Sequence, residues 1–152
     1  MGLTQNNISV KFDNRTTYRP GAKFAQHELQ GVPLRMAIGP KDLENKTVEL
    51  SRRDDFSKRI VSTESIEKKI PEILEDIQKS LFLRANDFRL EHTTEVNSFD
   101  EFKQVLNNKG GFISAHWDGS SETENKIKQL TKATIRCIPL DNNISQGKCC
   151  KI

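Results

Sequence analysis

Residues 18–42, with the sequence YRPGAKFAQHELQGVPLRMAIGPKD, constrain the fold more than any other part of the chain. The turn at Arg19-Pro20-Gly21 predicts the start of a helix, which Gly31 and Pro33 end. Residues 34–38 then form an apolar strand, which is closed by Gly39-Pro40. Polar and basic side chains stand wherever the backbone changes direction, so they either hold a ligand or simply cover the turns of an α/β unit.

Strand patterns surround this segment. Residues 8–12 alternate apolar and polar side chains with period two, which predicts a half-buried strand. Residues 47–53 alternate in the same way, and the turn expected at residues 42–46 would join them to residues 34–38 in an antiparallel hairpin. Residues 58–61 fit either a short strand or a loop.

A helical pattern follows the strands. Pro71 cannot lie deep inside a regular helix, so we expect it either to start the main helix or to kink it. The apolar residues that recur at helical spacing are Ile66, Ile70, Ile73, Leu74, Ile77, Leu81, Ala85 and Phe88.

The pattern changes again near residue 94. Ser98 is a predicted cap of a helix that Gly110-Gly111 ends, and Ser120 or Ser121 caps a second helix. Residues 112–117 and 133–140 are predicted strands. A helix–strand–helix–strand order is typical of a small α/β layer with a crossover connection. We therefore predict two domains, residues 1–92 and residues 93–152.

Several function classes find no support in the sequence. No phosphate-binding, dinucleotide-binding or metalloprotease motif is present, and the three histidines are isolated, so no catalytic residue is predicted. Cys149 and Cys150 are adjacent and lack the spacing of a zinc site, while Cys137 lies among apolar residues and is expected in a core, so no metal site is predicted. No apolar run approaches the roughly 18 residues of a membrane span. We expect a cytoplasmic protein that does not enter a membrane.

Charge is unevenly distributed. Residues 1–60 hold 11 Lys and Arg against 7 Asp and Glu, whereas residues 61–152 are nearly neutral. Single-stranded nucleic acid is bound by aromatic rings that stack on bases and by basic side chains that hold phosphates. An ordinary charged surface is the alternative. The residues near turns are Lys23, Arg35, Lys41, Arg52, Arg53, Lys58 and Arg59, interleaved with Tyr18, Phe24 and Phe56.

A family resemblance bears on this choice. The segment RPGAKFAQHELQGVPLRMAIGPKDLENKTVELSRRD resembles the anticodon-binding domain of prolyl-tRNA synthetases of the eukaryote/archaeon-like type, and GGFISAHWDGSSETENKIKQLTKATIRCIPLD resembles the C-terminal domain of the same enzymes. The resemblance implies an α/β fold. It consists of the mixed β-sheet of class II synthetase anticodon-binding domains, without its first strand and helix, followed by a small α/β C-terminal domain.

The resemblance also implies roles for particular residues. The matching positions are Phe24 for stacking on a base, with Glu28, Arg35, Lys41 and Asp42 for contacts to base edges and phosphate. Such carboxylates can accept from the donors of guanine, and the basic groups can donate to its acceptors. The implied partner is the anticodon stem-loop of a proline tRNA. Weaker candidates, for the tRNA backbone, are Lys23, Arg52, Arg53 and Lys58; of Arg52 and Arg53, alternation lets at most one face that surface.

The resemblance has limits. The catalytic motifs that use ATP and Mg in the full enzyme are not in this sequence, so we expect no cofactor here and no prolyl-adenylate formation by the chain alone. We expect the full enzyme to be a homodimer, and the missing first strand to leave a sheet edge open. Zinc-bearing relatives have cysteines where this chain has Asp118 and Thr123, so zinc binding is expected to be lost. The alternative function is a stand-alone protein-interaction or scaffold module that keeps the fold without recognising tRNA.

Overall fold

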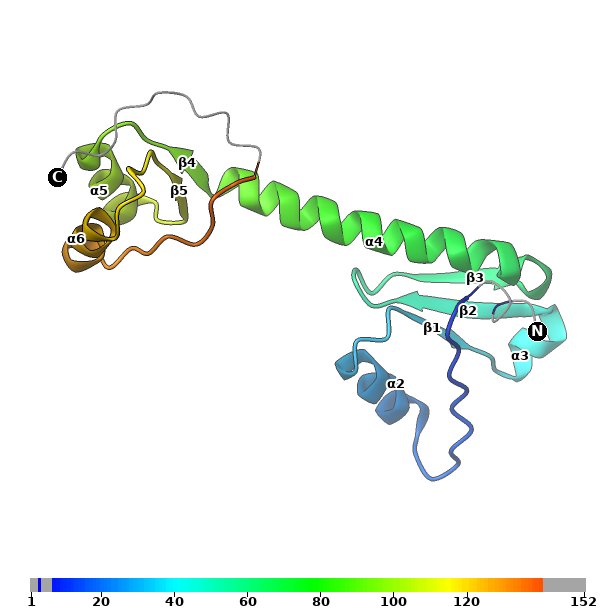
Figure 1. The fold of residues 1–152 in the computed structure, drawn as a ribbon. Coiled ribbons are helices and arrows are strands. Elements are labelled where there is room, and N and C mark those ends of the chain that lie inside the picture. The colour runs from blue at the N-terminus through cyan, green and yellow to red at the C-terminus, as the bar shows by residue number, and fades with distance from the viewer. Residues whose placement is uncertain (1–2, 4–6, 141–152) are drawn as a thin grey trace. The chain divides into compact units, whose positions relative to one another are not determined.

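The computed structural model describes residue 3 and residues 7–140. The chain divides into two compact units, Met1–Arg84 and Ala85–Ile152 (Figure 1). The predicted domain boundary between residues 92 and 93 stays a prediction. Both units combine helices with strands, which confirms the α/β class.

Three strands form the sheet of the first unit. β1 (Leu34–Ala37), β2 (Thr47–Arg52) and β3 (Lys58–Ser62) are antiparallel and lie in the order β1-β2-β3. Arg35 pairs with Ser51 across β1 and β2, and Ser51 pairs with Lys58 across β2 and β3. The predicted hairpin is therefore confirmed, and residues 58–61 belong to a strand.

The connection between β1 and β2 differs from the predicted turn. It contains a short helix, α3 (Pro40–Asn45). Pro40 has a φ suited to the first helical position, and Oδ2 of Asp42 accepts a hydrogen bond from the Gly39 amide at 2.8 Å. Lys46 ends the helix in a left-handed conformation. The sequence predicts a turn at residues 42–46, but it did not predict that Pro40–Asn45 would form a helix.

The core of the first unit lies between the sheet and helix α4 (Ile66–Glu91), which follows a short 3₁₀ turn, η1 (Thr63–Ser65). Val48 and Leu50 of β2 pack against Ile73 and Ile77 of α4. Pro71 lies inside α4, five residues after its start, so of the two predicted alternatives the structure excludes that Pro71 starts the helix.

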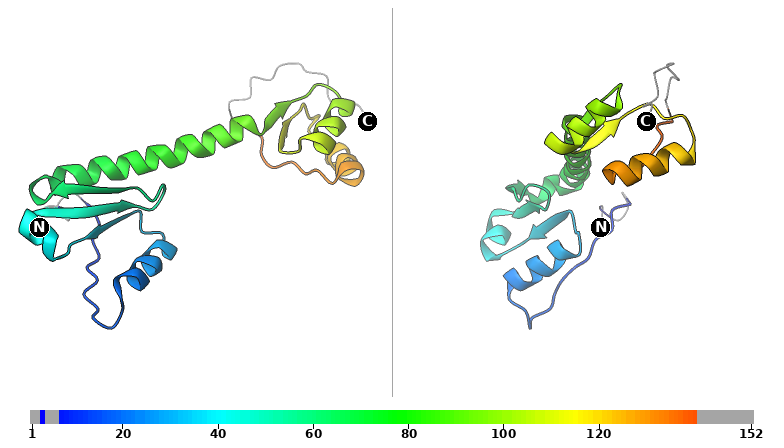
Figure 2. Two further views of the ribbon diagram at one scale, coloured as in Figure 1. Left: turned by 180° about the vertical axis from the view of Figure 1, so that it is seen from behind. Right: turned by 90° about the vertical axis from the view of Figure 1, so that its left-hand side faces the viewer.

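Helix α2 (Pro20–Leu29) lies on the other side of the sheet from α4 (Figures 1 and 2). Residues 8–12, the predicted first strand, pair with none of the described strands, and Phe12 is 85% exposed. Alternation alone was misleading because it cannot show whether a sheet edge is available. Instead, the following residue, Asp13, ties this segment to α2.

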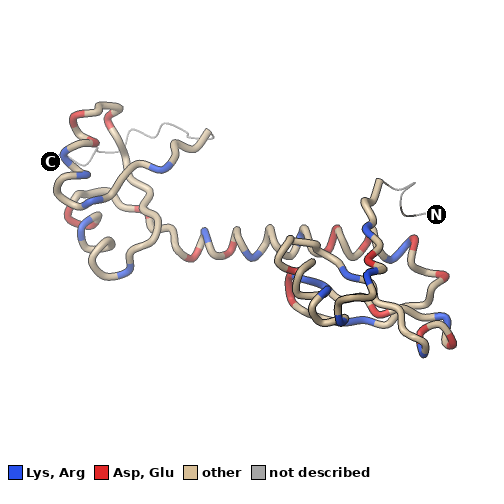
Figure 3. The backbone as a smooth tube through the Cα atoms, turned by 90° about the horizontal axis from the view of Figure 1, so that it is seen from below, with Lys and Arg blue, Asp and Glu red and all other residues tan. Residues whose placement is uncertain are grey.

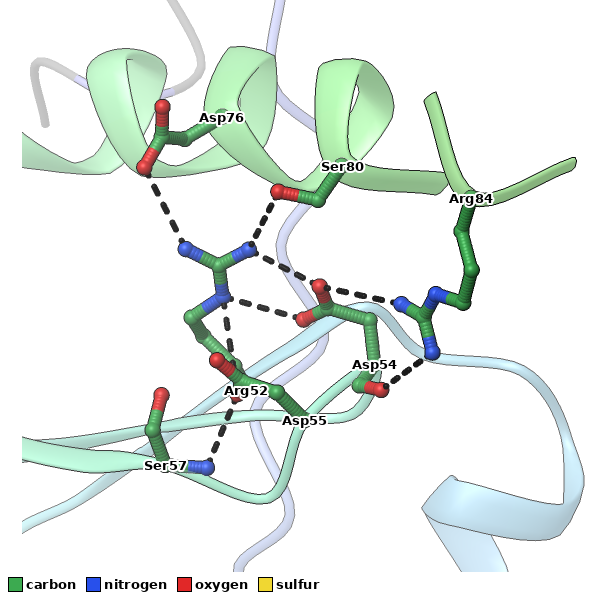
Figure 4. A network of polar contacts seen from close by, with 7 residues as sticks. All are labelled: Arg52, Asp54, Asp55, Ser57, Asp76, Ser80 and Arg84. Carbon is green, nitrogen blue, oxygen red and sulfur yellow. Dashed lines mark hydrogen bonds and ion pairs between the residues drawn. The ribbon is translucent and has the colours of Figure 1, made fainter. Parts of the chain in front are cut away.

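A buried ionic network fixes the β2–β3 turn to α4 (Figure 4). The Arg52 guanidinium donates to both oxygens of Asp54 at 2.9 and 2.8 Å and to Asp76 of α4 at 3.3 Å. Arg84 of α4 donates to the Asp54 carbonyl at 3.2 Å. The side chains of Arg52 and Asp54 are only 7% and 3% exposed, so each needs the other to remain charged inside the protein.

The second unit is built around a parallel strand pair. β4 (Thr93–Glu95) and β5 (Phe112–Ser114) are joined by α5 (Phe99–Asn108), and α6 (Ser121–Thr131) follows. Ser98 and Ser120 cap the two helices, as predicted. The predicted order offered residues 112–117 and 133–140 as the strands of the crossover, whereas the observed crossover joins β4 to β5 through α5. The sequence did not predict β4, because three residues give no clear alternation.

Two other predictions for this unit are wrong. The strand predicted at residues 112–117 ends at Ser114, and residues 133–140 form no strand. Ile138 and Leu140 are exposed there, and Cys137, which was expected in a core, is exposed as well. β4 is the only described partner of β5, so the apolar residues after α6 find no strand to pair with.

Candidate nucleic-acid interface

The face of the sheet turned away from α4 carries the central candidate residues. Successive side chains of a strand point to opposite faces. Leu34 and Met36 of β1 therefore join the core, while Arg35 between them points toward α2. The short strand β1 thus places one arginine opposite the helix that bears Phe24 and Glu28.

Phe24, Glu28 and Arg35 form one cluster. The Arg35 Cζ atom lies 3.7 Å from the centroid of the Phe24 ring, and Nη1 donates to Oε1 of Glu28 at 2.7 Å. Phe24 and Glu28 are four residues apart in α2, so they share a face of the helix. The structure brings together three of the five residues that the resemblance implied.

The cluster is partly closed to solvent. The Arg35 side chain is 15% exposed and that of Glu28 is 38% exposed. The Nε atom of Arg35 is buried and has no partner among the described residues. Nη1 of Arg35 donates to Oε1 of Glu28, and no further hydrogen bond or ion pair joins this carboxylate to another described side chain. A carboxylate acceptor, that of Glu28, and an unused N–H donor, the Nε of Arg35, therefore lie side by side.

Arg53, the residue directly after β2, holds the same helix through a hydrogen bond. Its Nε donates to the backbone carbonyl of Glu28 at 2.7 Å, and its amide donates to the Pro33 carbonyl at 3.0 Å. Its neighbour Arg52 belongs to the buried network with Asp54. The side chains of Arg52 and Arg53 thus point to opposite faces of the sheet, toward α4 and α2 respectively, as their alternation predicts.

Lys41 and Asp42 lie apart from the cluster, in α3. Asp42 caps its own helix through the Gly39 amide, and its Oδ1 accepts from the Thr47 hydroxyl at 3.4 Å. The Lys41 residue is exposed. Asp42 therefore stabilises the start of α3 in the free protein, whereas Lys41 is exposed to solvent.

A second polar cluster centres on Asp13, which sequence reasoning missed. Arg15 donates to both carboxylate oxygens at 2.8 and 2.7 Å, and Nε2 of His27 lies 2.9 Å from Oδ2. These hydrogen bonds, that of Arg15 first, hold the pKa of Asp13 well below its ordinary value. Lys23 approaches the same carboxylate at 3.9 Å. No spacing rule reveals this cluster, because Asp13 and His27 are 14 residues apart.

The remaining candidates for the tRNA backbone differ in how available they are. Lys58 forms an ion pair with Glu49 at 3.1 Å but is 57% exposed. The Asp54 carboxylate, which lies beside the Arg52 guanidinium, raises the pKa of Arg52. Along the backbone of the first unit, basic and acidic residues are interspersed (Figure 3).

Asp118 and Thr123 contact each other in the second unit, and the expected loss of zinc binding stays a prediction. Oδ2 of Asp118 accepts from the Thr123 hydroxyl at 2.6 Å, and Oδ1 accepts from the Ser120 amide at 2.8 Å. These two residues bind each other and the start of α6, so they do not fit a zinc site. The described residues contain no group of three or more His, Cys, Asp or Glu that could hold a metal ion. Cys149 and Cys150 lie outside the described residues.

None of the helices in the described part of the chain combines the length and the apolar composition that a membrane crossing requires.

Comparison with known proteins decides the family. Residues 1–73 match the model of the anticodon binding domain, and residues 99–151 match the model of the prolyl-tRNA synthetase C-terminal domain. The chain belongs to the prolyl-tRNA synthetase family. The recognition of this family from the sequence is thereby confirmed.

Individual relatives agree with this family. The proline–tRNA ligase of Christiangramia forsetii is 62% identical over 93% of this chain, and that of Porphyromonas gingivalis is 52% identical over 97%. The prolyl-tRNA synthetase of Cryptosporidium parvum, solved with L-proline and AMP, has a TM-score of 0.81 at 32% identity over 95% of this chain. The chain spans about 30% of the length of each of these proteins.

Proposed function

We propose that this chain recognises the anticodon of proline tRNA as part of a proline–tRNA ligase. The observation that carries the proposal is the cluster of Glu28, Arg35 and Phe24, in which a carboxylate and a guanidinium lie against an aromatic ring. The two family models that cover the chain support it, because one is an anticodon-binding domain.

The chemistry of the cluster suits guanine. A carboxylate such as Glu28 can accept from N1–H and N2–H₂, and an arginine can donate to O6 and N7. The Arg35 guanidinium already lies against the Phe24 ring. A base can therefore stack on the free face of the guanidinium, or on the Phe24 ring after Arg35 moves aside. Binding guanine would replace the Glu28–Arg35 ion pair with hydrogen bonds to the base.

The other candidate residues have secondary roles in this proposal. Lys41 and Asp42 would contact a neighbouring base or phosphate, and Asp42 would have to share the carboxylate that caps α3. Lys23 and Lys58 would hold the tRNA backbone after leaving Asp13 and Glu49. Arg52 would act through the fold instead, since its guanidinium is engaged by Asp54.

The complete ligase would supply the rest of the activity. Aminoacylation of tRNA with proline would consume ATP with Mg in a catalytic domain, and neither matched family model is a catalytic one. We further propose that the complete enzyme is a cytoplasmic homodimer. In this division of labour, the chain contributes binding energy for tRNA and no chemical step.

A titration of the chain with anticodon stem-loops tests the proposal. Glu28→Ala and Arg35→Ala should each weaken binding of a proline stem-loop by roughly 1–3 kcal/mol and relax discrimination at one base. Lys41→Ala should weaken all stem-loops alike and lower the salt dependence if Lys41 contacts phosphate. Equal affinity of the wild-type chain for proline and non-proline stem-loops at two salt concentrations would instead favour the scaffold function.

A further inference from the structure

We propose that Arg53 is a positioning residue for Glu28, and that it does not contact the tRNA backbone itself. This inference rests on the proposed function, because it assigns Arg53 a task in the same anticodon site. It concerns one hydrogen bond, from Nε of Arg53 to the backbone carbonyl of Glu28 at 2.7 Å.

The location of that carbonyl gives the bond its importance. The last carbonyls of a helix have no partner within the helix. α2 ends at Leu29, and the Glu28 carbonyl accepts from the Gly31 amide at 3.1 Å as well as from Arg53. A cation at this end is also favoured by the helix dipole. Arg53 therefore stabilises the last turn of α2, from which the Glu28 side chain extends to Arg35.

The backbone of Arg53 is fixed independently. Its amide donates to the Pro33 carbonyl at 3.0 Å, which extends the pairing of β1 and β2 by one residue. The preceding residue, Arg52, is anchored to Asp54 and Asp76 on the other side of the sheet. Arg53 is thus a rigid point on the sheet, and its side chain connects that point to the recognition helix.

The alternative role, a phosphate contact, predicts different behaviour. A phosphate contact depends on the charge of Arg53. Loss of one such contact to a single strand should lower the salt slope of binding by about 0.7. A positioning role depends on the donor at the Nε position. Glutamine places an amide nitrogen at this position without the charge, whereas methionine places a methyl group there. The two substitutions therefore separate the donor from the charge.

The experiment uses the chain with two proline anticodon stem-loops, one with guanosine and one with inosine at the discriminated base. Inosine lacks the N2 amino group that Glu28 would accept from. Arg53→Met should lower the preference for guanosine over inosine by about tenfold. Its salt slope should change no more than that of the control Arg59→Gln, which removes an exposed charge from β3. Arg53→Gln should keep the preference.

Equal preference for guanosine in Arg53→Met and the wild-type chain would overturn the inference. So would a uniform loss of affinity in both variants with a lower salt slope, because it would identify a phosphate contact. If Arg53→Met does not fold, Arg53→Gln decides: a lost preference refutes the positioning role. Failure of the wild-type chain to distinguish the two stem-loops would instead count against the proposed function.

Discussion

Replacing Arg52 with methionine tests the buried network that holds the β2–β3 turn to α4. The substitution keeps most of the side-chain length and removes a guanidinium that makes four hydrogen bonds, two to Asp54, one to Asp76 and one to Ser80. Asp54, whose side chain is 3% exposed, would keep its charge but lose its closest partner. Arg84, at 3.8 Å from Asp54 Oδ2, compensates only in part because its side chain is 59% exposed.

The expected cost is large for one substitution. Removing one member of a buried ion pair costs about 3–5 kcal/mol, because the other charge remains buried without compensation. A domain of this size loses about 4–8 °C in Tm per kcal/mol, so the first unit should melt at least about 12 °C lower. The matched control, Arg59→Met, removes an exposed arginine and should change the free energy of unfolding by less than about 0.5 kcal/mol.

Urea unfolding followed by circular dichroism at 222 nm measures this cost. The single tryptophan, Trp117, belongs to the second unit and gives an internal reference by fluorescence. The hydrogen bonds from Arg52 lower the pKa of Asp54 below its ordinary 3.8, so the pair stabilises the fold above about pH 4 and loses this effect as the pH falls through the lowered value. The difference between wild type and Arg52→Met should therefore shrink in acid. A loss under 1 kcal/mol at pH 7, or a pH-independent loss, would refute the buried-pair explanation.

Two further predictions concern the second unit. Gly111→Ala should destabilise it by at least about 2 kcal/mol, because φ is +89° and the new Cβ would lie 2.6 Å from the His92 carbonyl oxygen. The control Gly110→Ala, at φ +66° with nothing within 4 Å of the new Cβ, should cost only the backbone strain of about 1–2 kcal/mol. Equal losses of stability in the two variants would contradict this explanation. Asp118→Asn should lower the Tm of the Trp117 transition at pH 7, because hydrogen bonds from Thr123 and Ser120 lower the pKa of Asp118 and stabilise its charged form in the folded protein. The Tm difference should shrink as the pH falls through this lowered pKa, and a difference that does not change with pH would contradict this origin.

Local chemistry made much of the fold predictable from the sequence. Ser98 and Ser120 cap helices because a hydroxyl before a helix accepts from its first amides, and this requires no knowledge of distant residues. The strand β1 was predicted from an apolar run closed by Gly39-Pro40, and β2 was predicted from alternation. In contrast, residues 8–12 and 133–140 have strand-like patterns without strands, because pairing depends on a neighbouring strand edge that no local pattern describes.

The candidate site was predictable only in part. Phe24 and Glu28 were expected on one helix face from their spacing, and the structure adds Arg35 to them from a different element. The roles of Arg52 and Arg53 could not be separated in the sequence beyond their alternation, because each depends on partners that are distant in the sequence. Asp54 is close in sequence, but Asp76 and the Glu28 carbonyl are 24 and 25 residues away.

These two arginines connect stability with recognition. Arg52 fixes the end of β2 to α4, and Arg53, the next residue, fixes the same point to the last turn of α2. Loss of Arg52 should therefore affect the site through the fold, reducing binding and stability together. Loss of the Arg53 donor should affect discrimination while leaving most of the core unchanged, because its bond reaches only the surface helix. A variant of Arg52 that kept full stability but lost base discrimination would contradict this division.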